Sequence, residues 1–139
     1  MRYLLLGLLL GSTFVLAADL PRTAAPEGAA VYIIIPAHGE VVTSPVRVVF
    51  GLKNMGIAPA GVQREASGHH HLLIDTDLPD LDLPIPASTK HLHFGKGQSE
   101  TIIELPPGEH TLQLLLGDAL HIPHQPPVMS KPISIIVRP

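Results

Sequence analysis

The stretch His69-His-His-Leu-Leu-Ile74 decides how this sequence folds. Successive side chains of a β-strand point to opposite faces, so a strand here places His69, His71 and Leu73 together on one face. His70 then lies on the opposite face, between apolar neighbours, where we expect a core histidine that is hydrogen-bonded to the backbone. This one segment therefore predicts both a strand and a pair of imidazoles side by side.

Similar short strand patterns lie on both sides of this segment. Fifteen prolines and twelve glycines interrupt the chain, and proline disfavours helices because it removes a backbone donor and clashes with the preceding turn. Runs of β-branched or alternating residues between these breaks predict strands at 31–35, 45–52, 69–74, 91–94, 98–105, 110–116 and 128–137. We therefore predict an all-β fold over 31–139, an immunoglobulin-like two-sheet β-sandwich of about seven strands. A small barrel is the alternative.

The N-terminus has the pattern of a secretory signal peptide. Arg2 precedes an apolar run that ends in small residues at Ala17 and Ala18, which predicts a signal peptide over 1–18 and a periplasmic or secreted protein. The run is short for a membrane anchor, so we expect no stable membrane span after cleavage. The Ala-, Pro- and Gly-rich residues 19–30 predict a flexible lead-in.

Composition excludes several classes of function. The formal net charge is −3, which argues against nucleic-acid binding because that requires clustered basic residues. The chain has no cysteine, so disulfides and thiolate metal sites are impossible. The nine histidines are therefore the most notable candidates for metal ligands in the chain.

The histidines are spaced for metal binding. Two H-x-H pairs, His69/His71 and His91/His93, each place two imidazoles roughly 6–7 Å apart on one strand face. We predict that the two pairs meet across neighbouring strands and bind copper or zinc, both of which imidazole suits. The predicted ligands are drawn from His69, His71, His91, His93, His121 and His124. Met55 and Met129 are potential thioether ligands, which would favour Cu(I), and Asp75, Asp77 and Asp118 are potential acceptors for the second imidazole nitrogen.

Two other hypotheses stay open. The histidines can instead form a structural network in a non-catalytic domain that binds an envelope protein. Alternatively, a metal with an open coordination position can serve an enzyme, with Glu65, Asp75 or Asp118 as the base, although the sequence carries no catalytic signature. We expect His110 to be structural, because it shares a strand face with leucines, and His38 to be exposed at a turn.

Long segments of the mature chain resemble a known family. They are Gly68-His-His-His-Leu-Leu-Ile-Asp-Thr-Asp77, His91-Leu-His-Phe-Gly95, Gln98-Ser-Glu-Thr101, Pro106-Pro-Gly-Glu-His-Thr-Leu-Gln-Leu-Leu-Leu-Gly-Asp118, His121-Ile-Pro-His124 and Pro126-Pro-Val-Met-Ser130. Together they resemble the secreted bacterial domain of unknown function DUF4399, over about Val31 to Val137. The resemblance implies an exported β-rich sandwich and no particular activity. Members of this family often carry a further histidine where this chain has Ala119-Leu120, so a site that used that position would here either bind more weakly or rely on His121 instead.

Overall fold

The computed structural model describes residues 20–139, and the signal peptide expected over 1–18 lies outside the described residues. The described chain forms nine strands and no helix. Their bounds are β1 Ala30–Ile35, β2 Val41–Thr43, β3 Val46–Lys53, β4 Gly56–Ile57, β5 Ser67–Ile74, β6 His91–His93, β7 Glu100–Ile103, β8 Gly108–Gly117 and β9 Ile133–Arg138. Accordingly, no helix in this part of the chain is long and apolar enough to cross a membrane.

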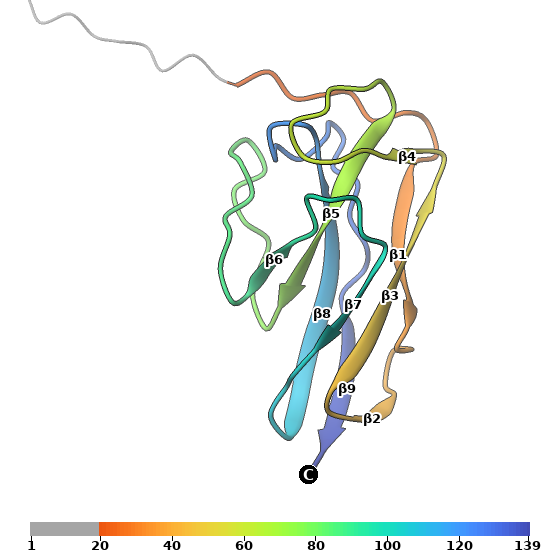
Figure 1. Cartoon of the computed structure of the whole chain (residues 1–139), viewed down its shortest axis with the longest axis vertical. Helices are drawn as coiled ribbons and strands as arrows, with labels where there is room; N and C mark the ends of the chain where they lie inside the picture. The colour runs from red at the N-terminus through yellow and green to blue at the C-terminus, as the bar shows by residue number, and fades with distance from the viewer. Residues whose placement is uncertain (1–19) are drawn as a thin grey trace, which may run out of the picture.

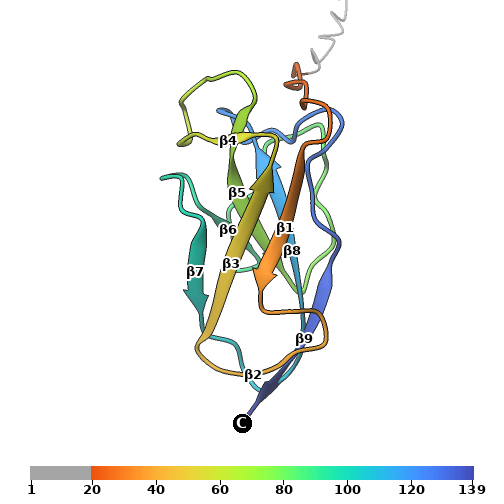
Figure 2. The same cartoon turned by 90° about the vertical axis from the view of Figure 1, so that its right-hand side faces the viewer.

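The strands form two sheets (Figures 1 and 2). The smaller sheet has the order β1-β3-β7, and the larger has the order β2-β9-β8-β5-β4, with β6 also paired to β5. In Figure 2 the smaller sheet faces the viewer, and β5 and β8 lie behind it. The predicted all-β sandwich is confirmed. All seven expected strands are present, and β2 and β4 are two further short ones.

Apolar side chains from both sheets fill the space between them. The core includes Val48 and Phe50 of β3, Leu72 of β5, Leu114 of β8 and Ile135 of β9. Full burial of such a side chain contributes about 1.5–3 kcal/mol, so this interface is the main source of stability. It also fixes the two faces of β5, because Leu72 must point inward.

All eight residues of β5 are buried, including those that face away from the core. The outward face is covered because the loop between β5 and β6 folds over it, and Leu81 and Ile85 of this loop pack on Leu73 of β5 and Leu115 of β8. His69 and His71 share this outward, loop-covered face with Leu73. The sandwich thus has a second, smaller buried layer outside its larger sheet.

Residues 20–25, here called the N-terminal strap, lie against the loop between β8 and β9. Ala24 pairs with Gln125 in a parallel bridge. The backbone nitrogen of Gln125 donates to the Thr23 oxygen at 2.9 Å, and that of Ala25 donates to the Gln125 oxygen at 3.0 Å. This part of the expected lead-in is therefore tied to the domain by hydrogen bonds before β1 begins.

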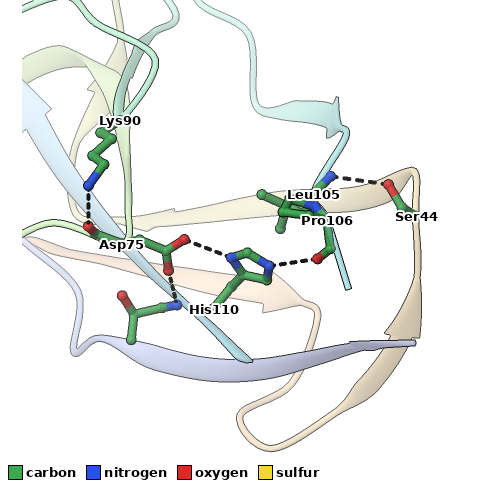
Figure 3. A network of polar contacts seen from close by, with 7 residues as sticks. Ser44, Asp75, Lys90, Leu105, Pro106 and His110 are labelled. Carbon is green, nitrogen blue, oxygen red and sulfur yellow. Dashed lines mark hydrogen bonds and ion pairs between the residues drawn. The ribbon is translucent and has the colours of Figure 1, made fainter. Parts of the chain in front are cut away.

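A second polar network joins β5 to β8 at the opposite end of the sheet (Figure 3). His110 Nδ1 lies 2.7 Å from Asp75 Oδ2, and His110 Nε2 lies 2.8 Å from the Pro106 oxygen. The other carboxylate oxygen of Asp75 accepts from the Thr111 backbone at 2.8 Å. Both imidazole nitrogens of His110 are engaged by protein acceptors, so His110 has the structural role expected of it. His38 is exposed, also as expected.

Candidate metal centre

The candidate centre lies on the outward face of β5, where strand pairing brings the two H-x-H segments together. His71 on β5 is the register partner of His93 on β6, and their ring centroids are 5.1 Å apart. His69 lies 4.8 Å from His71 and 5.0 Å from His93 by the same measure. Three imidazoles from two strands thus face one another.

The nitrogens of these three rings converge. One nitrogen from each of His69, His71 and His93 can be chosen so that all three lie within 4.8 Å of one another. The centre of such a triangle is at most about 2.8 Å from each corner, whereas an ion needs nitrogens at about 2.0–2.1 Å. An inward movement of roughly 0.7 Å per ring closes that difference. The cluster can therefore hold a metal ion after small side-chain adjustments.

The buried nitrogens of this cluster have no other use among the described residues. His69 and His71 are 0% and 1% exposed, and neither nitrogen of either ring has a hydrogen-bond partner in residues 20–139. Burial of an unpaired polar group costs about 1–3 kcal/mol. The structural-network hypothesis requires hydrogen-bonded rings, and these two rings form no such bonds within residues 20–139.

His121 is the fourth imidazole of the cluster. Its ring centroid lies 4.7 Å from that of His93, 5.0 Å from that of His69 and 6.0 Å from that of His71. It comes from the loop after β8 and has a φ of 67°, a left-handed conformation that is rare for residues other than glycine. The surrounding hydrogen bonds must hold this backbone in place.

The other two predicted ligands lie outside the cluster. His91 is paired with Leu73 rather than with a histidine of β5, and its Nδ1 lies 3.0 Å from Ser88 Oγ. His124 is fully buried, and its Nε2 lies 3.1 Å from the Ser67 oxygen. The structure therefore brings four of the six predicted histidines together and engages the remaining two elsewhere.

Two glycines make room for the rings. A Cβ at Gly117 would lie 2.9 Å from His71 Cε1 and 3.2 Å from the Cα of His121. A Cβ at Gly95 would lie 2.6 Å from His93 Nε2. These are closer than ordinary van der Waals contacts, so a larger residue at either position would displace an imidazole.

Most of the described chain, including the whole histidine cluster, matches a known protein family. Residues 48–138 match the domain of unknown function DUF4399, a stretch that runs from β3 to β9 and contains every histidine of the cluster. The chain belongs to the DUF4399 family. No curated protein and no solved structure matches the chain. The expected membership of the DUF4399 family is confirmed.

Burial keeps the two innermost imidazoles of the cluster in this DUF4399 domain, His69 and His71, uncharged at neutral pH. It lowers the pKa of His69 to about 4, with further lowering by His121 and His93 and an opposing effect of Asp118. Burial likewise lowers the pKa of His71 to about 2, with His69 adding to the effect. The pKa of His93 is also lowered, by burial and then by His121. Uncharged imidazole is the form that binds a metal.

Two of the carboxylates considered from the sequence, Asp75 and Glu65, and both thioethers lie away from the cluster, whereas Asp118 lies beside it and acts on the pKa of His69. Asp75 is engaged by His110 at the opposite end of the sheet, and Glu65 is exposed. Met55 packs against the sandwich core, and Met129 pairs with Leu115 on the side of β8 away from β5. The cluster is therefore built from imidazoles, a donor set that suits divalent copper or zinc more than Cu(I).

Proposed function

We propose that this DUF4399 protein is an exported metal-binding protein that holds Cu(II) or Zn(II) with His69, His71 and His93. The observation that carries the proposal is the convergence of their nitrogens to within 4.8 Å. The signal-like N-terminus supports export. In an exported protein, such a site would serve to buffer or deliver the metal in the periplasm.

The protonation states of the cluster support tight binding at neutral pH. Metal ions compete with protons for imidazole. Because burial lowers the pKa of His69 to about 4 and that of His71 to about 2, each ring is already neutral at pH 7 and binds a metal without first losing a proton. Binding of the ion would also satisfy buried nitrogens that otherwise lack partners.

The choice between the two ions follows from general affinity trends. Nitrogen sites bind Cu²⁺ more tightly than Zn²⁺ at equal availability, so we expect Cu(II) to be preferred in a direct competition. Exposed His93 and half-buried His121 lie at the solvent side of the cluster, whereas His69 and His71 are buried. That arrangement suits an ion that enters and leaves by exchange at the exposed ligand.

The test is metal content followed by titration. Untagged protein, purified without nickel affinity, is analysed by mass spectrometry and then titrated with Cu(II) and Zn(II) against a competing chelator. We expect one ion per chain, bound more tightly than about micromolar. The double variant His71→Ala/His93→Ala is expected to lose at least about 100-fold in affinity and to keep its fold.

The matched control is His91→Ala, which removes the other imidazole of the same short strand. Its ring lies outside the cluster, so its affinity should stay within about threefold of that of the unmodified protein. Equal metal binding by the double variant and the control would refute the proposal. So would the absence of stoichiometric binding by the unmodified protein.

A further inference from the structure

The N-terminal strap contacts the loop that carries His121 through side chains as well as backbone. Arg22 Nε donates to the Pro123 oxygen at 3.0 Å, and the Arg22 guanidinium also donates to the His124 oxygen. A third bond joins Arg22 Nη1 to Asp82 Oδ1 at 3.0 Å. Arg22 thus connects the strap both to the loop between β5 and β6 and to the loop between β8 and β9.

The neighbouring residue of the strap bonds to the carboxylate that shapes the His121 loop. Thr23 Oγ1 donates to Asp118 Oδ2 at 2.7 Å. The other carboxylate oxygen of Asp118 accepts from the backbone nitrogens of Leu120 at 2.9 Å and Ile122 at 3.0 Å. These two amides flank His121, so the Asp118 carboxylate holds the turn that presents the His121 ring.

Two further backbone bonds fix His121 itself. Its nitrogen donates to the Asp118 oxygen at 2.9 Å, and its oxygen accepts from the Ile85 nitrogen at 2.8 Å. All of these bonds surround a residue in the left-handed conformation, which relaxes unless its neighbours hold it. The backbone position from which the His121 side chain extends is therefore set by polar contacts around the loop.

A cavity of about 100 Å³ lies between the strap and the loop, and Thr23, Ser67, Asp118 and Leu120 are among the residues that line it. Space on this side of the loop allows it to shift when a hydrogen bond is lost. The bond from Thr23 to the buried Asp118 joins two of these lining residues and ties the strap to the loop.

We propose that Thr23 and Asp118 act as positioning residues that hold His121 as the fourth ligand of the metal site, so that the N-terminal strap completes the coordination sphere. The inference rests on the proposed metal-binding function. It goes beyond the three converging nitrogens, because it assigns the fourth position to His121 and its control to a segment about 100 residues earlier in the chain.

The test compares Thr23→Val, Thr23→Ser and His121→Ala with the unmodified protein, each in the full exported chain. Cu(II) affinity is measured by chelator competition, and the number of bound nitrogens is measured by electron paramagnetic resonance. We expect four nitrogens in the unmodified protein and three in His121→Ala, whose affinity falls about 100-fold. Thr23→Val should lose about tenfold, as is usual for a residue that orients a ligand, and Thr23→Ser should retain affinity because it keeps the hydroxyl.

The double variant Thr23→Val/His121→Ala separates positioning from general destabilisation. If Thr23 acts through His121, the double variant binds Cu(II) as His121→Ala does, within about threefold. Thr43→Val, an exposed threonine on β2, is the matched control and should leave affinity and nitrogen count unchanged. An equal loss from Thr23→Val with and without His121 would overturn the inference.

Different experimental results would overturn the role of His121 and the strap, on the one hand, and the proposed metal-binding function, on the other. Tight, stoichiometric Cu(II) binding that is unchanged in His121→Ala would overturn the role of His121 and leave the three-histidine site standing. Absence of stoichiometric binding in the unmodified protein would overturn both proposals. A nitrogen count of four that persists in Thr23→Val without loss of affinity would overturn the role of the strap alone.

Discussion

Acidification should destabilise the metal-free protein steeply between pH 6.5 and about 4. Burial lowers the pKa of His69 and of His70 to about 4, and that of His71 to about 2, whereas all three return to about 6.5 in the unfolded chain. In this window the unfolded chain binds more protons than the folded one. The free energy of unfolding therefore rises with pH and is lost as the pH falls.

The size of the effect follows from proton linkage. Each histidine that is neutral when folded and charged when unfolded contributes a slope of about 1.4 kcal/mol per pH unit. A shift from 6.5 to about 4 removes about 2 kcal/mol by pH 5, so the three residues together remove about 6 kcal/mol relative to pH 8. Because small domains have only about 5–15 kcal/mol in total, we expect unfolding at mildly acidic pH.

The assay is urea denaturation in the presence of a chelator at pH 8, 7, 6 and 5. His70→Leu should reduce the slope by about one proton, or 1.4 kcal/mol per pH unit, since it removes one of the three groups and keeps the metal cluster. A free energy of unfolding that stays constant within 1 kcal/mol between pH 7 and pH 5 would refute the reasoning.

Two further predictions concern single contacts. Gly117→Ala should displace the His71 ring, because its Cβ would lie 2.9 Å from His71 Cε1, and we expect a loss of at least about tenfold in metal affinity by chelator competition. His110→Ala should lower the free energy of unfolding by about 1–2 kcal/mol near pH 5, because it removes the hydrogen bonds to Asp75 and Pro106. The loss is no larger because Asp75 is partly exposed and water can replace its lost partner. Burial alone would lower the pKa of His110, but its bonds to Asp75 and Pro106 raise it, so this contribution is present below pH 6.5 and is lost as the pH rises through the folded-state value. Burial alone would raise the pKa of Asp75, but its bonds to His110 and Thr111 lower it. The stability that the His110–Asp75 pair contributes is therefore also lost in strong acid, when Asp75 becomes protonated. Urea denaturation of the variant across pH measures the loss at both the alkaline and the acid end.

The alternation of β5 could be predicted from the sequence because it depends only on the two-residue period of a strand. It correctly places His69 and His71 on one face and His70 on the other. The choice between His91 and His93 depends on register, which the sequence does not specify. The two share a face of β6, but pairing sets His93 opposite His71 and His91 opposite Leu73.

The loop after β8 has no period from which side-chain directions follow. The sequence predicts His121 and His124 equally as metal ligands, because they form an H-x-x-H pair. In the structure the His121 ring lies beside the cluster, whereas His124 contacts the Ser67 oxygen. The difference arises from the hydrogen bonds of Asp118 and from the left-handed backbone at His121. The contacts of Arg22 and Thr23 could not be predicted from the sequence either, because they join segments about 100 residues apart.

His70 provides an internal comparison that sharpens the case for a metal site. Like His69 and His71, it is almost fully buried and has no hydrogen-bond partner for either ring nitrogen among residues 20–139. Its ring packs against Phe50 in the sandwich core, with centroids 5.0 Å apart, and it is not part of the converging group. Unpaired buried nitrogens therefore occur in this protein without a metal site, and they are not by themselves the signal. What distinguishes the outward face is that nitrogens of three imidazoles lie within 4.8 Å of one another, with the ring of His121 beside them, so that a single bound cation would satisfy several of them at once.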